Sequence, residues 1–275
     1  MRARRLALIA AGLVLLYFTV GAALCRYGLD HLLIPRTATS APVGGEPVEL
    51  GSELGVNLTL HRFGQGQLGC VLFFPGRHGN QPRYEQSLIP AFLKEGIVVF
   101  LVSYPGQDGT TGRVGIDEIQ LLAVSARQFV EQQCTPERTV LVGRSLGSMI
   151  AAYASANSSI AGLLLESASP SLSSSLRHGL AARWWTQPLG LLPIERLLRE
   201  DYSLRHAFPQ EPSFPVSVIQ GTGDTETPLS ELLPRDALPA GTTLMTVEAG
   251  THSNTYLIAP EAHVRAVLAM LKRRT

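Results

Sequence analysis

Short apolar runs alternate with helical patterns over most of the chain beyond residue 46. The runs are rich in β-branched residues, which is typical of a mainly parallel sheet whose faces are covered by helices. Eight strands are predicted, the first two of them antiparallel, near residues 47–51, 56–62, 70–75, 97–103, 139–142, 161–166, 215–220 and 243–248. The main helices are predicted over residues 83–95, 116–132, 147–156 and 259–272.

The alternation breaks over residues 168–213, which begin with several serines and contain prolines and short helical pieces such as 194–200. An insertion at this point lies over the carboxyl-terminal edge of the sheet, where a lid covers a site. Its larger apolar side chains either line a pocket, contact a bilayer or form the core of the insertion itself. They are Trp184, Trp185, Leu189, Leu191 and Leu192.

An uncharged apolar stretch runs from Leu6 to Leu24 and follows three arginines. As a helix this stretch rises about 28 Å, close to the hydrocarbon thickness of a bilayer. Arginines before a span favour keeping that end in the cytoplasm. We therefore expect a single-pass anchor, with the rest of the chain on the extracytoplasmic side, periplasmic or lumenal. The small residues 21–23 (GAA) leave a cleaved signal peptide as the alternative, which would make the protein secreted.

Composition divides the chain into three predicted parts. Residues 1–34 hold the arginines and the anchor. Residues 35–46 are rich in proline, glycine, serine and threonine, which is typical of a linker. Residues 47–275 are long enough for one α/β domain with a full hydrophobic core.

Charge and cysteine content exclude some classes of function. The chain has 23 basic and 22 acidic residues, so its net charge of +1 provides no general field that would attract nucleic acid. The three cysteines do not have the spacing of a zinc site. A structural metal is therefore not expected, and nothing in the sequence indicates an oligomeric state.

The strongest candidate for chemistry is the pentapeptide GRSLG at residues 143–147, which joins a predicted strand to a predicted helix. A tight turn of this kind strains its middle residue and needs small neighbours two positions away on either side. The two glycines meet that need, so the context predicts Ser145 as an exposed nucleophile. The alternative is an ordinary helix start that the same hydroxyl caps.

A serine nucleophile needs a base, and the base needs an orienting acid. Asp224 and His252 each follow one of the last two predicted strands, so their loops belong to the same edge of the sheet as Ser145. We predict His252 as the base and Asp224 as the acid. Two other carboxylates are alternative acids, namely Glu166 and Glu226.

Acyl transfer also needs two backbone N–H groups that face the developing negative charge, the arrangement called an oxyanion hole. The residue after the nucleophile, Leu146, is expected to supply one of them. The other is expected from the loop at residues 75–80, where Gly76 allows a sharp turn. Arg77 is the predicted second donor, and His78 is the next candidate.

Six segments of the chain resemble the α/β-hydrolase superfamily: FFPGRHGN, SYPGQDGTTG, VGRSLGS, LLLESASPSL, QGTGDTETP and AGTHS, in this order. The resemblance covers about residues 47–272 and is to N-terminally membrane-anchored, single-domain serine hydrolases with a short lid. It implies an eight-stranded, mostly parallel sheet flanked by helices and a reaction without a metal or organic cofactor. The chain departs from relatives in two loops, with Pro75-Gly76 where they have His-Gly and Pro105 where they have arginine.

The resemblance implies hydrolysis of an ester, thioester or amide through an acyl-enzyme on Ser145. The expected substrate is a small-molecule or lipid-like acyl compound, and the nearness of a membrane makes lipids attractive. A serine peptidase or an acyltransferase on the same triad is one alternative. A non-catalytic, membrane-tethered binding module is another, although such a module would usually lack one member of the triad.

The implied topology also suggests a disulfide. If it holds, the strands at 70–75 and 139–142 are neighbours, and Cys70 and Cys134 both precede them at the edge opposite the site. A Cys70–Cys134 bond would then form in an oxidising compartment. The alternative is two unpaired cysteines that pack as small apolar residues.

Overall fold

The computed structural model describes residues 2–51, 57–79, 81–208, 211–233 and 238–273. Within these residues, eight strands form one sheet in the order β1-β2-β4-β3-β5-β6-β7-β8. The pairs β1–β2 and β2–β4 are antiparallel and the other pairs are parallel. The strands are β1 (Glu46–Gly51), β2 (Asn57–Phe63), β3 (Gly69–Phe74), β4 (Ile97–Ser103), β5 (Thr139–Arg144), β6 (Gly162–Glu166), β7 (Val216–Gly221) and β8 (Thr243–Val247). All eight predicted strands are present, although residue 56 of the second prediction lies outside the described residues.

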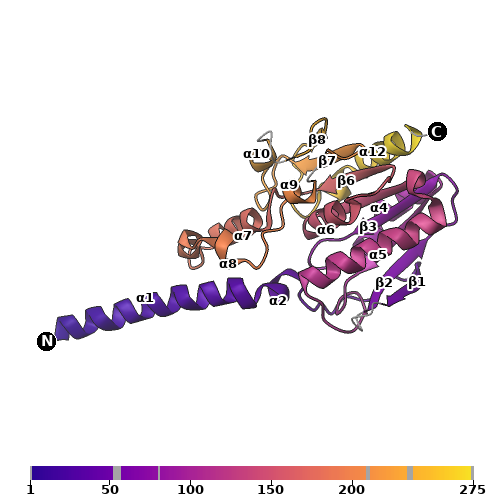
Figure 1. Ribbon diagram of the computed structural model, residues 1–275. Coiled ribbons are helices and arrows are strands. Elements are labelled where there is room, and N and C mark those ends of the chain that lie inside the picture. Colours follow the sequence, from indigo (N-terminus) through magenta and orange to yellow (C-terminus); the bar gives the residue numbers. More distant parts are fainter. Residues whose placement is uncertain (1, 52–56, 80, 209–210, 234–237, 274–275) are drawn as a thin grey trace.

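Helices cover both faces of this sheet (Figure 1). One face carries α5 (Ile116–Cys134) and α6 (Leu146–Ser155), and the other carries α3 (Gln81–Glu85), α4 (Leu88–Lys94) and α12 (Pro260–Lys272). Shorter helices in the described chain are α2 (Leu29–Leu33), η1 (Pro136–Arg138), α10 (Leu229–Leu232) and α11 (Thr255–Ile258). The architecture is the predicted mostly parallel sheet between two layers of helices.

The central strands contribute to two hydrophobic cores at once. In β3, Leu72 and Phe74 belong to the core under α5 and α6, whereas Val71 and Phe73 belong to the core under α4 and α12. Every residue of β3 is buried. Because successive side chains of a strand point to opposite faces, a strand covered on both sides is apolar throughout. This double burial explains the continuous apolar runs in the sequence.

The prediction of a single helix over residues 83–95 is wrong, because two helices occupy this stretch. α3 ends at Glu85 and α4 begins at Leu88. Pro90 has no N–H and cannot donate to the carbonyl four residues earlier, so it is tolerated in a first helical turn but not in a helix interior. The break places Pro90 in the first turn of α4.

The insertion between β6 and β7 contains more helix than its sequence predicted. It holds α7 (Leu172–Ala181), η2 (Gln187–Leu191), α8 (Ile194–Leu197) and α9 (Leu204–Ala207). Ser171 accepts a hydrogen bond from the N–H of Ser174 and so caps α7. The serines that seemed to mark irregular structure therefore start a helix.

The apolar N-terminal stretch forms α1 (Arg2–Tyr27), which is long and apolar enough to cross a membrane. Its amino-terminal part projects beyond the rest of the molecule, as Figure 1 shows. The segment predicted as a linker lies against the loop that follows β4. There the Gln107 side chain donates to the carbonyl of Pro35 at 2.9 Å, and the N–H of Thr37 donates to the carbonyl of Gly106 at 3.2 Å. These bonds tie the end of the helical N-terminus to the sheet domain.

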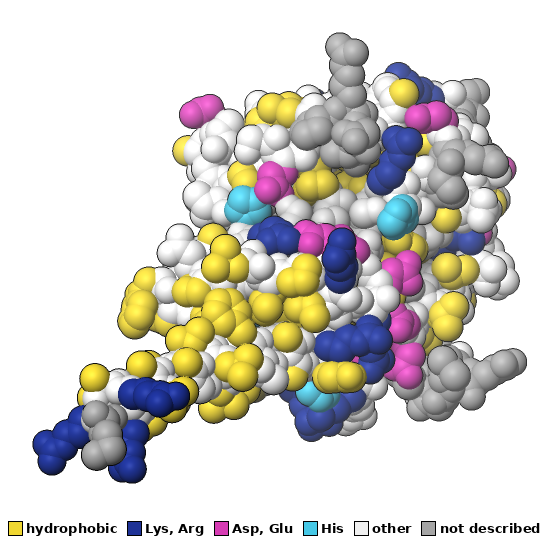
Figure 2. Space-filling model, turned by 60° about the vertical axis from the view of Figure 1, so that its left-hand side comes forward, with side chains coloured by type: hydrophobic (Ala, Val, Ile, Leu, Met, Phe, Trp, Pro, Cys, Tyr) yellow, Lys and Arg dark blue, Asp and Glu magenta, His cyan; other side chains and the backbone are white. Residues whose placement is uncertain are grey.

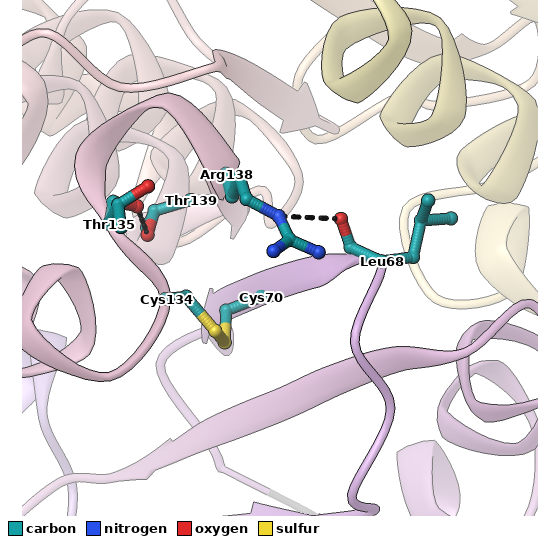
Figure 3. Close-up of a disulfide and its surroundings, with 6 residues drawn as sticks. All are labelled: Leu68, Cys70, Cys134, Thr135, Arg138 and Thr139. Atoms are coloured by element: carbon teal, nitrogen blue, oxygen red, sulfur yellow. Dashed lines mark hydrogen bonds between the residues drawn. A yellow bond between two sulfur atoms is a disulfide. The ribbon is translucent and has the colours of Figure 1, made fainter. Parts of the chain in front are cut away.

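Cys70 and Cys134 form a disulfide between the start of β3 and the end of α5 (Figure 3), so of the two alternatives for these cysteines the structure has the bonded one. Their Cα atoms are 6.0 Å apart, and 64 residues separate them in the sequence. Beside the bond, the Arg138 side chain donates to the carbonyl of Leu68 at 3.2 Å. The disulfide lies at the edge of the sheet opposite Ser145, because Cys70 starts β3 and Ser145 follows the end of the parallel neighbour β5.

Removing this disulfide is expected to lower the free energy of unfolding. In the chain-entropy account, closing a loop of this length contributes about 4 kcal/mol, so the double variant Cys70→Ala/Cys134→Ala should unfold at a clearly lower urea concentration. Circular dichroism of the protein in detergent measures the shift. Cys25→Ala, which removes the free cysteine, is the matched control. Equal midpoints for wild type and the double variant would contradict the prediction.

Candidate active site

Ser145 occupies a strained turn between β5 and α6. Its backbone has φ 53° and ψ −120°, a region that residues with a side chain rarely adopt. A Cβ atom at position 143 would lie 2.2 Å from the carbonyl oxygen of Gly147, and one at position 147 would lie 2.1 Å from that of Phe74. Both glycines of the pentapeptide are therefore required by close backbone contacts.

The hydroxyl of Ser145 does not cap α6, so the alternative interpretation of this serine is wrong. Its Oγ atom lies 2.8 Å from Nε2 of His252. The other ring nitrogen of His252, Nδ1, lies 3.1 Å from Oδ2 of Asp224. Three loops from distant parts of the chain thus bring a hydroxyl, an imidazole and a carboxylate into one hydrogen-bonded series.

The carboxylate of Asp224 is fully buried and accepts several further hydrogen bonds. Its Oδ1 accepts from the N–H groups of Glu226 and Thr227 at 3.0 and 2.9 Å. Its Oδ2 accepts from the Thr227 hydroxyl at 2.8 Å. Burial opposes ionisation, but the bonds from His252 and Thr227 outweigh it and hold the pKa of Asp224 below its ordinary value. The group is therefore a charged acceptor at neutral pH.

Glu166 and Glu226, the alternative acids, occupy different positions. Glu166 is fully buried and faces Nε2 of His263 at 3.1 Å and Nε of Arg144 at 3.5 Å. Burial raises the pKa of Glu166, but His263 and Arg144 together lower it by more than burial raises it. The pKa of Glu166 is therefore below its ordinary value. Glu226 is 62% exposed, with a carboxylate oxygen 4.0 Å from Nε2 of His252. Of the three carboxylates, Asp224 is the one within hydrogen-bond distance of Nδ1.

Arg144 ties the turn of Ser145 to the loop of His252, a role that the sequence did not indicate. Its guanidinium donates to the backbone carbonyl of His252 and lies 5.3 Å from the centre of the Tyr256 ring. It also forms the ion pair with Glu166. Thr227, which holds Asp224, was likewise missed, and the only sequence signal for it is its place three residues after that aspartate.

The loop that follows β3 lies against Ser145. A Cβ atom at Gly76 would be 3.5 Å from the Cβ of Ser145. The Tyr104 hydroxyl donates to the carbonyl of Pro75 at 2.9 Å, and the Gln107 side chain donates to the carbonyl of Arg77 at 2.6 Å. These bonds hold the backbone on either side of Arg77, the predicted donor, and next to His78, the other candidate. Residue 80, the last of this loop, lies outside the described part of the chain.

No group of three or more histidine, cysteine, aspartate or glutamate side chains that could hold a metal ion is present among the described residues. Chemically, a hydroxyl beside an imidazole whose other nitrogen meets a buried carboxylate is suited to nucleophilic attack on an acyl carbon. The fold and this arrangement define the class of α/β hydrolases.

The chain belongs to the Alpha/beta hydrolase family, whose pattern matches residues 71–272. No curated protein matches the chain significantly.

Several solved structures share the fold. An esterase from Pyrococcus furiosus is 19% identical, with a TM-score of 0.65 over 88% of this chain and 97% of the esterase. A hydrolase from Pseudomonas aeruginosa is 18% identical, with a TM-score of 0.62 over 83% of this chain and 99% of that protein. An esterase from Exiguobacterium antarcticum is 17% identical, with a TM-score of 0.61 over 82% and 100% of the two chains. At these identities the likeness concerns the fold.

Proposed function

We propose that this protein is a serine hydrolase that cleaves carboxylic esters or related acyl bonds through an acyl-enzyme on Ser145. The observation that carries the proposal is the series from Ser145 Oγ to His252 and from His252 to Asp224, at 2.8 and 3.1 Å. The similar structures from Pyrococcus furiosus and Exiguobacterium antarcticum are described as esterases, which supports an ester as the substrate.

In the proposed reaction, His252 accepts the Ser145 proton at Nε2 while Oγ attacks the acyl carbon. The imidazolium that forms is stabilised by the charged, buried carboxylate of Asp224. His252 then gives the proton to the leaving alcohol, and the acyl group stays on Ser145. Water attacks this ester with His252 again as base, which releases the acid and restores the hydroxyl.

The backbone N–H groups of Leu146 and Arg77 are proposed to bind the oxyanion of the tetrahedral intermediate. Leu146 starts α6, where the first N–H groups have no partner within the helix. Arg77 follows Gly76, at which a Cβ atom would lie 3.5 Å from the Cβ of Ser145. The proposal therefore takes one donor from the start of α6 and the other from the loop after β3.

Activity on p-nitrophenyl esters of increasing chain length tests the proposed reaction. The purified full chain in detergent is expected to release p-nitrophenol from at least the shorter esters, without added metal and in the presence of a chelator. The dependence on chain length would begin to define the acyl pocket. Absence of hydrolysis across the whole series, with a folded protein, would contradict an esterase function.

We further propose that residues 1–34 anchor the protein in a membrane through α1 and hold the domain of residues 47–275 on the extracytoplasmic side. The arginines at positions 2, 4 and 5 favour this orientation. The Cys70–Cys134 disulfide supports it as well, because such bonds persist in oxidising compartments. A cleaved signal peptide would instead separate α1 from the domain.

A further inference from the structure

The insertion between β6 and β7 lies beside the carboxyl-terminal half of α1 (Figure 1). The hydroxyl of Tyr17 donates to the backbone carbonyl of Trp185. One turn further along α1, a Cβ atom at Gly21 would lie 2.4 Å from a methyl group of Leu189, so the glycine allows the close approach. Gly21 is the buried residue of α1. The insertion therefore packs directly on the candidate membrane span.

This insertion carries large apolar side chains that remain mostly exposed in the described chain. Trp184 is 81% exposed, Trp185 is 53% exposed and Leu191 is 82% exposed. α1 also exposes apolar side chains, among them Leu13, Leu16 and Val20. Figure 2 shows hydrophobic side chains gathered on α1 and on the part of the molecule next to it.

Residues 179–194 of the insertion differ in charge from the residues around them. Residues 179–194 of the insertion contain one charged side chain, Arg183, whose guanidinium lies 5.9 Å from the centre of the Trp185 ring. A long cationic side chain at this position can reach the headgroups. The next part of the insertion, with Arg199 and Glu200, lines a small cavity together with Arg26 at the end of α1. Residues 179–194 are thus almost free of charge, whereas charged residues flank them. The partly exposed Arg177–Glu195 pair holds the carbonyl of Gly190, and α8, which contacts α1, contains Glu195 and Arg196.

The contacts with α1 also indicate how deep the insertion would lie in a bilayer that α1 spans. Leu24 is the last residue of the uncharged stretch. Counted back from Leu24 along the helix axis, toward the membrane centre, Gly21 lies about 4 Å deeper and Tyr17 about 10 Å deeper. Amphipathic segments that lie in the membrane interface bury their apolar side by about 5–10 Å. Tryptophan is enriched at that level because its ring has an apolar body and a polar N–H.

We propose that residues 179–194 insert into the extracytoplasmic leaflet of the bilayer that α1 spans, with Trp184, Trp185 and Leu191 among the lipid chains. The inference rests on the proposed anchor. The insertion starts after β6 and ends before β7. β6 is the neighbour of β5, which Ser145 follows, and β7 leads into the loop of Asp224. Its immersion would turn the active-site edge of the sheet toward the membrane surface.

The protein itself provides the probe, because its only two tryptophans are Trp184 and Trp185. The full chain is reconstituted into phosphatidylcholine and phosphatidylglycerol vesicles, with a fraction of the lipid brominated either near the headgroup end or near the methyl end of the acyl chain. We expect loss of most tryptophan emission with bromine near the headgroup end, a smaller loss with bromine near the methyl end, and little quenching by aqueous iodide.

A matched control moves the fluorophore to the opposite side of the domain. In the variant Trp184→Phe/Trp185→Phe/Leu68→Trp, the single tryptophan lies in the partly exposed loop before β3, at the sheet edge away from Ser145. Its emission should be quenched by iodide and not by brominated lipid.

Flotation of the vesicles separates the possible failures. Wild-type protein that floats with the vesicles but is quenched like the control would overturn the insertion and leave the anchor intact. Protein that does not float would overturn the anchor and the insertion together. Ester hydrolysis, measured on the same samples, tests the proposed reaction independently of both results.

Discussion

Replacing Ser145 with alanine is expected to lower kcat by about 10⁶-fold. The substitution removes the atom that lies 2.8 Å from His252 Nε2 and that would carry the acyl group. It leaves the strained backbone and the contacts of both glycines in place, so the fold should be retained. Kinetics on the best p-nitrophenyl ester, with circular dichroism of the same samples, measure the two effects separately.

Ser155→Ala is the matched control for this variant. Ser155 is buried at the opposite end of α6 from Ser145, and its hydroxyl donates to the carbonyl of Ala152 at 2.7 Å. Its removal should leave kcat within a few-fold of wild type. Substantial turnover by Ser145→Ala would mean that another group attacks the substrate.

Asp224→Asn is expected to lower kcat by about 10⁴-fold with little change in KM. The carboxylate accepts at Oδ2 from Nδ1 of His252, and asparagine removes the negative charge that stabilises the imidazolium. An amide can also present its NH₂ group to Nδ1, which favours the wrong tautomer. Because hydrogen bonds lower the pKa of Asp224, wild-type enzyme keeps this charge as the pH falls to the ordinary aspartate range and below.

Glu226→Gln controls for the loss of one negative charge near the site. Glu226 is exposed and 4.0 Å from His252 Nε2, so solvent screens it and its removal should change kcat only a few-fold. A near-normal kcat for Asp224→Asn together with a large loss for Glu226→Gln would exchange the roles of the two carboxylates.

The sequence predicted the sheet well because its strands are buried on both faces. A residue such as Phe73 or Phe74 is apolar whichever core it faces, so each central strand appears as an uninterrupted run. Helix boundaries were less predictable where local chemistry decides them. Pro90 splits one predicted helix, and the Ser171 cap starts another within a stretch that was expected to be irregular.

The candidate site was predictable to the extent that its residues follow strands. Ser145 directly follows β5, and Asp224 and His252 lie in the loops after β7 and β8. These strands belong to the parallel part of the sheet, and the carboxyl ends of parallel strands share an edge. The supporting contacts were not predictable. Arg144 donates to the backbone carbonyl of a residue 108 positions away. Every residue has such a carbonyl, so the sequence cannot indicate which one accepts the bond.

The N-terminal region shows the same limit. Its composition predicted a membrane span and a linker, and both predictions follow from residue types alone. The bonds of Pro35 and Thr37 to the loop after β4, and the packing of Gly21 against Leu189, depend on segments that are distant in the sequence. A linker-like composition did not exclude these contacts, because backbone groups make most of them.

Labelling with a fluorophosphonate, followed by peptide mapping, shows whether Ser145 is the nucleophile, since this reagent forms a stable adduct with a serine activated by a neighbouring base. We expect one adduct, on Ser145, that is lost in Ser145→Ala and strongly slowed in His252→Ala. An adduct on a different residue, or labelling of Ser145→Ala at the wild-type rate, would contradict the role proposed for Ser145.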